Sequence, residues 1–446
     1  MQARPIKRAE FERPLLVLLS AVFVASLQFA YANMDSQLFG FLGLHWKSLT
    51  PFWTAVGFTM AVLPSLWMPV RLTRPSQVAY WILYLTVIVP VMWVPFHTLN
   101  TPPEDYLPFS IPFLGCFFVL GLTSRLPRWK IARPDIKSET FFFLVTALVT
   151  VFTLAVWSTN GFRFDLGLKG IYDRRRSSGE SIPMGSVLSY VKGNLGSALQ
   201  PYSFAVGLAR GSAVLVGLSL FAGIVGFSVD GSKTSAAIPL FLLALYPLIT
   251  KFRARFGPIV VVMGIVGVVG AYCAWAVTRN VGVPVISTWR LFDVKGLLTG
   301  YYWEFFSTHP KTLLSDGILR GFFANPYNYA APEQIGLVYF GSSDTNSNAN
   351  LWASAFGDFG YFGMALVTAL LAMIFRLIDS MSLNRGFLIP AFLASFLGMK
   401  LSDVALDTSI LSHGTLAILI LIYVLPPLQR KSPDSSPVTH PEVSLA

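Results

Sequence analysis

Three consecutive arginines, Arg174, Arg175 and Arg176, interrupt a chain in which only 12% of the residues are charged. They lie in the stretch GIYDRRRSSGES, and Tyr172 precedes them by two positions. Planar guanidinium groups pair bidentately with phosphate oxygens, so the run predicts a site for an anionic ligand. The alternative interpretation is an ordinary basic loop on the cytoplasmic side of a membrane. The topology of the chain distinguishes the two.

Lys233 and Asp358 are charged residues placed among apolar ones. Lys233, in DGSKT, begins an apolar run. A lysine at the start of a helix, beside free backbone N–H groups, suits a phosphate, and the alternative is a simple polar turn between helices. No glycine-rich run precedes the lysine, so ATP binding of the Walker type is not predicted. Asp358 lies within the apolar run LWASAFGDFGYFGMALVTALLAMIF, where an ionisable side chain is costly and is therefore a functional candidate.

The longest polar stretch, about residues 279–350, holds the remaining candidates. Trp303 suits either a belt at a membrane interface or stacking on a sugar ring, and the sequence does not separate the two. His309 is a lone histidine before a proline, which is more typical of a structural position than of a catalytic one, although histidine titrates where acid–base chemistry needs it. The sequence contains no HExxH motif and no paired cysteines, so it predicts no metal site.

Apolar runs set the fold class. Hydrophobic residues make up 54% of the chain, and many runs are about 20 residues long, the length of a helix across a bilayer core of about 30 Å. The runs do not alternate between apolar and polar residues, as the strands of a transmembrane barrel would. The sequence therefore predicts an all-α polytopic integral membrane protein with about 12 transmembrane helices. One helix is expected from Phe141 to Ser158 and another from Gly257 to Val277.

Basic loops orient these helices. SRLPRWKIARP and KFRARF carry clusters of lysine and arginine, which mark cytoplasmic loops. Alternation places both termini in the cytoplasm and makes two larger segments, about 160–201 and 279–350, external (periplasmic) loops. Residues 1–429 then form one transmembrane domain, and 430–446 form a disordered cytoplasmic tail. The net charge of +11 comes mostly from residues beside apolar runs, so no nucleic acid partner is predicted. The arginine run falls outside, which favours the anion site.

Three stretches resemble motifs of bacterial O-antigen and oligosaccharide repeat-unit polymerases, which belong to an O-antigen polymerase–ligase superfamily. GIYDRRRSSGES resembles the external loop in which a tyrosine and an arginine precede a re-entering helix. DGSKTSAAIPLFLL resembles a serine-plus-cation motif that begins a helix, and NSNANLWASAFGDFGYFGM resembles the late motif with an asparagine, an aspartate and FGxxG. The resemblance covers about residues 160–375. The ligases carry a histidine in the large loop, and the surroundings of His309 do not match theirs closely.

The resemblance implies a membrane-embedded fold of the GT-C type and a metal-independent glycosyltransferase without a cofactor. Its donor and acceptor are expected to be undecaprenyl-pyrophosphate-linked oligosaccharides. These repeat units would be joined at the outer face of the inner membrane into O-antigen, capsule or exopolysaccharide. Membrane lipids and a chain-length regulator are the other expected partners.

The same resemblance implies roles for the candidate residues. An acceptor hydroxyl attacks the anomeric carbon, with Asp358 or His309 as the catalytic base and Glu304 as a third candidate. Arg175 and Arg290 are expected to stabilise the charge of the departing pyrophosphate. The residues expected to bind the substrate are Arg174, Arg176, Lys233, Tyr172 and Trp303.

Two alternative functions stay open. The first is a ligase of the same superfamily, which hands a finished glycan to a lipid or protein acceptor. The second is a transporter or flippase of lipid-linked sugars. A flippase is expected to carry charged residues along a central path through many helices, whereas the predicted topology gathers the cations at external helix ends. The sequence therefore favours an enzyme acting at the outer face.

Overall fold

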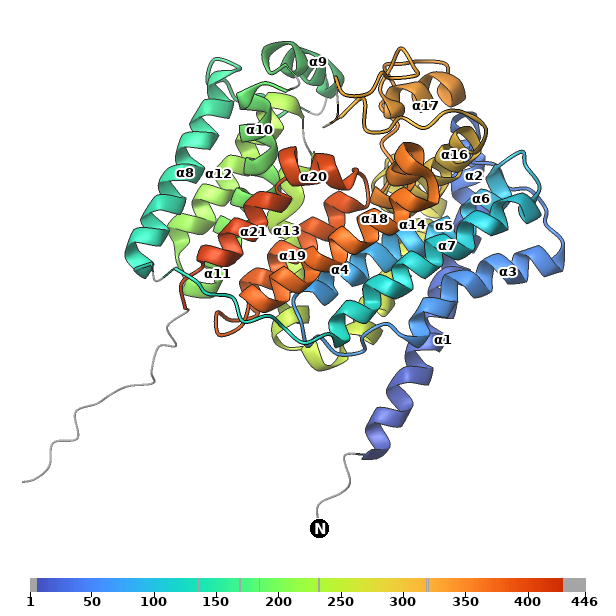
Figure 1. The fold of residues 1–446 in the computed structure, drawn as a ribbon, viewed down its shortest axis with the longest axis horizontal. Helices are drawn as coiled ribbons and strands as arrows, with labels where there is room; N and C mark the ends of the chain where they lie inside the picture. Colours follow the sequence, from blue (N-terminus) through green and yellow to red (C-terminus); the bar gives the residue numbers. More distant parts are fainter. Residues whose placement is uncertain are drawn as a thin grey trace, which may run out of the picture.

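The computed structural model describes residues 6–134, 136–167, 170–183, 185–231, 233–317, 319 and 321–427, and within them every regular element is helical (Figure 1). The first helices are α1 (Ile6–Ala30), α2 (Ser36–Leu38), α3 (Pro51–Val62), α4 (Ser76–Leu83), α5 (Val89–Val91), α6 (Val94–Thr98), α7 (Pro103–Leu122), α8 (Ser138–Ser158), α9 (Ile171–Ser181) and α10 (Val187–Asn194). The later helices are α11 (Gln200–Arg210), α12 (Ala213–Asp230), α13 (Lys233–Thr250), α14 (Phe256–Thr278), α15 (Gly282–Pro284), α16 (Val294–Thr308), α17 (Ala331–Phe340), α18 (Leu351–Met381), α19 (Leu388–Leu401), α20 (Leu406–Ser412) and α21 (Thr415–Val424). The π-helical segments are η1 (Tyr31–Asp35), η4 (Tyr84–Ile88), η6 (Leu195–Leu199) and η8 (Val285–Asp293).

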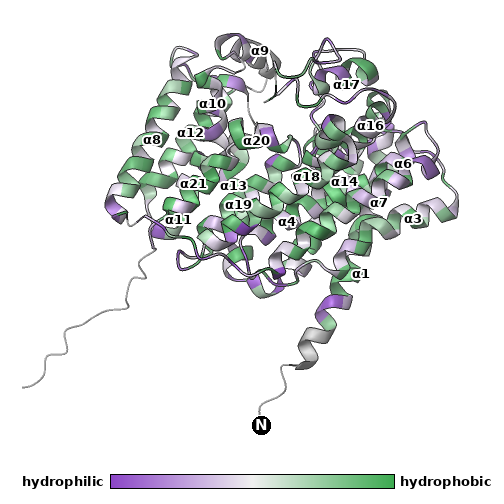
Figure 2. Ribbon diagram, viewed as in Figure 1, coloured by the Kyte–Doolittle hydropathy of each residue, from purple (hydrophilic) through white to green (hydrophobic). Residues whose placement is uncertain are grey.

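In the described chain, seven helical stretches are long and apolar enough to cross a membrane, or up to eight if the bent pair α20 and α21 counts as one. They are Phe11–Leu38, Ser76–Thr98, Pro103–Arg125, Ser138–Ser158, Ala213–Asp230, Arg253–Thr278 and Leu351–Met381. Apolar residues fill the helix bodies, while polar residues gather in loops and at helix ends (Figure 2). The predicted helices Phe141–Ser158 and Gly257–Val277 correspond to α8 and α14. The prediction of an all-helical, multi-pass membrane protein is confirmed.

Helix α19 packs closely on both α4 and α11. At the contact with α4, a Cβ atom on Gly398 would lie only 2.9 Å from the Cα atom of Ala79. A small residue is therefore required there, as is common where two membrane helices approach closely.

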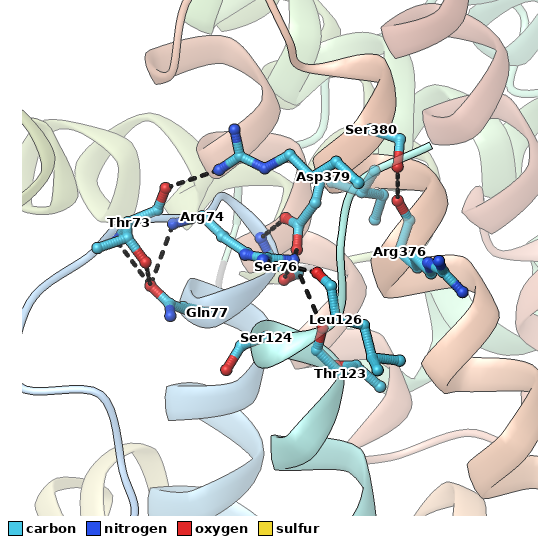
Figure 3. Close-up of polar contacts among 12 residues, drawn as sticks. Thr73, Arg74, Ser76, Gln77, Thr123, Ser124, Leu126, Arg376, Asp379 and Ser380 are labelled. Carbon is cyan, nitrogen blue, oxygen red and sulfur yellow. Dashed lines mark hydrogen bonds and ion pairs between the residues drawn. The ribbon is translucent and has the colours of Figure 1, made fainter. Parts of the chain in front are cut away.

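Helices α9 and α17 lie at one end of the molecule, and the first residues of α1 lie at the other (Figure 1). Asp379, near the end of α18, connects α18 with α4 and α7 (Figure 3). Its carboxylate accepts hydrogen bonds from the backbone N–H of Ser76 at 3.0 Å and from the Ser76 hydroxyl at 2.8 Å. The Arg74 guanidinium lies 3.9 Å from the same carboxylate and donates to the carbonyl oxygens of Thr123 and Leu126. These contacts, called the Asp379 clamp below, fix the lower part of α18.

Helix α18 is a helical hairpin and not one straight span. The indole N–H of Trp352 donates to the hydroxyl of Thr368 at 2.9 Å, whereas 16 residues of a straight helix would extend about 24 Å. The chain reverses at Phe359 and Gly360, where Gly360 has φ +64° and ψ −145°, a conformation essentially restricted to glycine. The prediction of one continuous helix over this run is therefore wrong. Asp358 ends the first arm, residues 351–358, and lies at the turn.

The segment predicted to be a loop at about 279–350 also contains buried helix. Residues 282–308 form the continuous succession α15, η8 and α16. Within α16, Lys295 and Thr299 are buried, and a Cβ atom on Gly296 would lie 2.8 Å from the carbonyl oxygen of Pro90. The polar residues that make this stretch look like a loop are oriented toward other helices, which supply their partners.

Candidate functional site

A cavity of about 190 Å³ lies beside the turn of the α18 hairpin. Asp316, Asp358 and Asp407 all line it, and we call it the aspartate pocket. Its other walls come from the start of α17, from the turn before α20, and from Asn346 and Asn348 in the extended segment that leads into α18. Irregular backbone is tolerated at membrane depth where it lines a cavity. None of the described residues that line the pocket is basic.

Asp358 is held by the loop that follows α16. The Thr312 hydroxyl donates to the Asp358 Oδ1 atom at 2.5 Å, and the backbone N–H of Leu314 approaches the same atom at 3.4 Å. The backbone N–H groups of Thr312 and Leu313 donate to the carbonyl oxygens of Gly357 and Asp358 at 3.1 and 3.2 Å. Asp358 is 9% exposed. The carboxylate is thus fixed in direction while one edge stays open to the pocket.

The same loop is strained. Leu313 and Leu314 have φ values of +54° and +57°, which place two consecutive leucines in the left-handed region. Non-glycine residues rarely adopt this region, and each instance costs on the order of 1–3 kcal/mol. Such strain gathers at functional sites, where neighbouring structure enforces it. Here it brings the backbone N–H of Leu314 toward Asp358.

Two other aspartates, together with Glu333 of α17, complete the acidic lining. The Asp316 Oδ2 atom accepts a hydrogen bond of 2.7 Å from the backbone N–H of Ala331, at the start of α17. Asp407 lies in the first turn of α20. A Cβ atom on Gly317 would lie 3.1 Å from the Asp407 Oδ2 atom, so the strained loop passes directly over Asp407. The lining therefore carries four carboxylates, those of Asp316, Glu333, Asp358 and Asp407.

An apolar groove of about 300 Å³ adjoins the aspartate pocket. The groove and the pocket share Leu314, Asp358, Ala405 and Asp407. The remaining lining is almost entirely apolar and consists of Leu351, Ala355, Phe359, Gly363, Leu366, Val367, Leu370, Leu406, Ile410 and Leu411. A polar pocket that continues into an apolar groove suits a ligand with a polar head and a hydrocarbon chain.

Lys311 is the cation next to the hairpin turn. Its ammonium group lies 3.9 Å from the centre of the Phe356 ring and donates to the carbonyl oxygen of Phe306 at 2.5 Å. Burial lowers the pKa of Lys311 to about 8. This lysine therefore loses its charge within the mildly alkaline range.

A second polar region, the charged row, lies on the other side of the turn between α19 and α20. The Lys295 ammonium donates to the Ser402 hydroxyl at 2.6 Å and lies 3.3 Å from the Asp403 carboxylate. Lys192 pairs with Asp230 at 2.8 Å. Lys400 interacts electrostatically with both Asp403 and Asp230, so it lies between the two pairs. Acidic and basic side chains thus alternate from α10 through α12 and α19 to α16.

Arg290 and Arg174 have different surroundings. Arg290 is exposed on η8 and lies near enough to Lys295 to repel it, so it belongs beside the charged row. Arg174 forms an ion pair of 2.7 Å with Asp165 and donates to the carbonyl oxygen of Gly167. The Gly167 backbone N–H and the Arg174 guanidinium hold the pKa of Asp165 below its usual value. Arg174 therefore has a partner within its own loop.

Four predicted residues have side chains outside the described part of the structure. Tyr172, Arg175 and Arg176 belong to α9, and Lys233 is the first residue of α13. Figure 1 shows α9 at the same end of the molecule as α17, whose first residues border the aspartate pocket. The predicted tail, 430–446, also falls outside the described residues.

The structure does not bring Trp303, Glu304 and His309 into the lining of the aspartate pocket. Trp303 is buried and packs edge-on against Tyr106, with ring centres 5.1 Å apart. Glu304 accepts a hydrogen bond of 2.9 Å from the Tyr339 hydroxyl. His309 is exposed and stacks on Phe305 with ring centres 4.2 Å apart. Among the predicted bases, Asp358 alone lines the pocket.

Sequence reasoning missed Asp316, Asp407, Lys295 and Lys400. Lys400 and Asp407 both stand in the run LASFLGMKLSDVALDTSI, where ionisable residues within apolar sequence are themselves a functional signal. Asp316 and Lys295 stand in a polar stretch that carries no such signal. Their relevance depends on contacts with distant segments.

Comparison with known proteins adds no assignment. No protein-family model, no curated protein and no solved structure matches this chain.

Proposed function

We propose that the protein is a polymerase that joins lipid-pyrophosphate-linked oligosaccharide repeat units into a surface polysaccharide. The observation that carries the proposal is the junction of the aspartate pocket with the apolar groove at Asp358 and Asp407. A substrate with a saccharide head and a long isoprenoid chain requires this combination of adjacent polar and apolar surfaces.

The proposed topology places this junction toward the outer face of a bacterial inner membrane. Basic residues gather at the end of the molecule that holds the start of α1. The guanidinium groups that donate hydrogen bonds to neighbouring segments there are those of Arg13, Arg71, Arg74, Arg128 and Arg253. Such clusters are typical of the cytoplasmic side. The opposite end, with α9 and α17, is then external. A total of about 12 spans and a GT-C-type arrangement are part of the proposal.

Asp358 is proposed as the catalytic base. The acceptor hydroxyl gives its proton to Asp358 as its oxygen bonds to the anomeric carbon. At the same time the bond between that carbon and the phosphate oxygen breaks, and the lipid pyrophosphate leaves with the electron pair. Asp316 and Asp407 accept hydrogen bonds from sugar hydroxyls, a role for which partly exposed carboxylates are suited.

The acidic lining requires the pyrophosphate to lie outside the aspartate pocket. Lys311 is the described cation nearest to the hairpin turn. The arginines of α9, with Arg175 foremost, and Arg290 and Lys233 are proposed to supply the positive charge that stabilises the pyrophosphate. Tyr172 and Arg176 are proposed to bind the substrate. Such pairing of phosphate with cations needs no metal ion.

A ligase of the same superfamily is the second candidate. It would use the same pocket and groove and differ in its acceptor. A transporter of lipid-linked sugars is the third candidate, and the charged row through α10, α12, α19 and α16 is the observation that favours it.

The test measures chain growth in proteoliposomes supplied with undecaprenyl-pyrophosphate-linked repeat units from the source bacterium. Asp358→Asn is expected to lower the rate of chain extension about 10²–10⁴-fold. Asp344→Asn changes an exposed aspartate in the same polar stretch and serves as the matched control. Full chain extension by folded Asp358→Asn protein would refute the assigned base. Transfer to a lipid or protein acceptor without chain growth would favour the ligase.

A further inference from the structure

A pair of buried carboxyl groups lies where η1 meets η8, apart from the aspartate pocket. Asp35 is 0% exposed and Asp293 is 1% exposed. Their side chains are within hydrogen-bonding reach of each other. The Thr288 hydroxyl donates to the Asp35 Oδ1 atom at 3.0 Å. No donor among the described residues reaches Asp35 Oδ2 or either oxygen of Asp293.

No cation among the described residues forms an ion pair with either carboxyl group. The elements packed on η8 are α14, α15, α16, η1, η4 and α5. Their titratable side chains, with those of η8 itself, are Tyr31, Tyr84, Tyr272, Cys273, Arg290, Lys295, Tyr301, Tyr302 and Glu304. Tyr31 interacts electrostatically with both carboxyl groups, but its hydroxyl donates to the carbonyl oxygen of His45. Lys295 is directed to Ser402 and Asp403 instead.

Two adjacent buried carboxylates without a counter-ion cannot both be ionised. Shared protons are the usual solution, with one carboxylic acid donating to one carboxylate. The local backbone supports a specialised role, because Asp35 and Asp293 each end a π-helical segment. Such segments occur frequently at functional sites.

We propose that Asp35 and Asp293 bind one shared proton, and that this proton fastens the end of α1 to the helix that carries Lys295. The proton forms an O–H bond to one carboxyl group and a hydrogen bond to the other. Removing it leaves two negative charges in contact and separates η1 from η8. Protonation thereby controls the position of α16 and of the charged row. This site is independent of the proposed polymerase activity.

The first test is infrared spectroscopy of the full-length protein in nanodiscs. The wild type is expected to show a carbonyl band of a protonated carboxyl group that shifts in heavy water. The band should disappear in both Asp35→Asn and Asp293→Asn, because either substitution removes the shared proton. Asp379→Asn is the matched control: this buried aspartate already receives donors from Ser76 and Arg74, so its substitution should remove no such band.

The second test is the pH dependence of unfolding in the same preparations. Unfolded aspartates are ionised above about pH 4, whereas the folded pair keeps one proton, so stability falls as pH rises. From pH 5 to pH 7, the unfolding equilibrium constant of the wild type should rise up to about tenfold per pH unit more than that of either Asn variant.

Each contrary result has a definite meaning. A wild-type band that survives in both variants, or equal pH slopes in all three proteins, overturns the proposal. Stabilisation of the wild type by sodium ions at constant pH, with no protonated-carboxyl band, would show that the pair binds a sodium ion in place of a proton. That result would also overturn the proposal. If one variant does not fold, the other single variant suffices, since each removes the same proton.

Discussion

The α18 hairpin carries one buried aspartate at its turn and another at its far end, and the two carboxylates differ in the donors that surround them. Asp379 is 1% exposed and receives two hydrogen bonds from Ser76 and the approach of Arg74. Asp358 is 9% exposed and receives one strong hydrogen bond, from Thr312. Three further carboxylates, those of Asp316, Glu333 and Asp407, line the same pocket as Asp358.

This difference separates a structural aspartate from a candidate catalytic one. A buried carboxylate with a full set of donors stabilises the fold. A carboxylate held by strained backbone, facing a cavity and other carboxylates, costs free energy and is retained for another reason. Burial alone would have ranked Asp379 above Asp358 as a site residue. The donors reverse this ranking, because Asp379 has a full set of partners and Asp358 does not.

The largest expected effect tests this comparison directly. Asp379→Ala should lower the free energy of unfolding by about 3–5 kcal/mol, because it leaves Arg74 and the Ser76 donors without their partner. Asp358→Ala should change it by no more than about 1 kcal/mol, since the lost hydrogen bond is offset by relief of repulsion among the four carboxylates that line the pocket. Both are measured by denaturant unfolding in detergent micelles. Equal losses at the two positions would remove the distinction.

The next prediction concerns the turn that places Asp358. Gly360→Ala should lower the free energy of unfolding by about 1–3 kcal/mol, because φ +64° with ψ −145° is accessible only to glycine. Gly115→Ala in α7 is the matched control, since nothing lies within 4 Å of the added Cβ atom and the residue is helical. Thermal unfolding of both variants gives the comparison. A neutral Gly360→Ala would mean that the hairpin turn is not required.

The smallest effect sharpens the role of Lys311. Its pKa is about 8, so the charged fraction falls about tenfold between pH 7 and pH 9. Binding of undecaprenyl pyrophosphate should therefore weaken by up to about tenfold over this range. Lys311→Arg stays charged and should bind equally at both pH values. Titrations in nanodiscs measure both proteins, and a wild type that binds without pH dependence would exclude Lys311 from the anion site.

The sequence contained the fold class but not the reversal of α18. Apolar composition predicts membrane helices well, and α8 and α14 lie where they are expected. The run after Asn350 is apolar on both sides of Gly360, so length and hydropathy indicate a single span. Only the torsion angles of one glycine and the contact of Trp352 with Thr368 reveal two arms. A reversal between two apolar arms leaves no compositional mark.

The candidate site was predictable to a similar extent. Asp358 was identifiable because it stands alone in apolar sequence. Asp316 and Asp407 were not, since they lie in separate segments that meet only in the folded chain. Lys295 was hidden for the same reason, because its partners Ser402 and Asp403 are more than 100 residues away.

The Asp379 clamp also constrains how the protein is made. Ser76 and Asp379 are 303 residues apart in the chain. At roughly 5–20 residues per second, translation separates them by about 15–60 s. During that interval the helix that begins at Ser76, the most buried of the candidate spans, must reside in the bilayer without the carboxylate that accepts from the Ser76 backbone N–H and hydroxyl. Any chaperone or lipid headgroup that binds this stretch early in synthesis has to be displaced when the last part of α18 emerges. A chain halted before Asp379 would therefore keep a helix start without its carboxylate partner and would be a target for quality control.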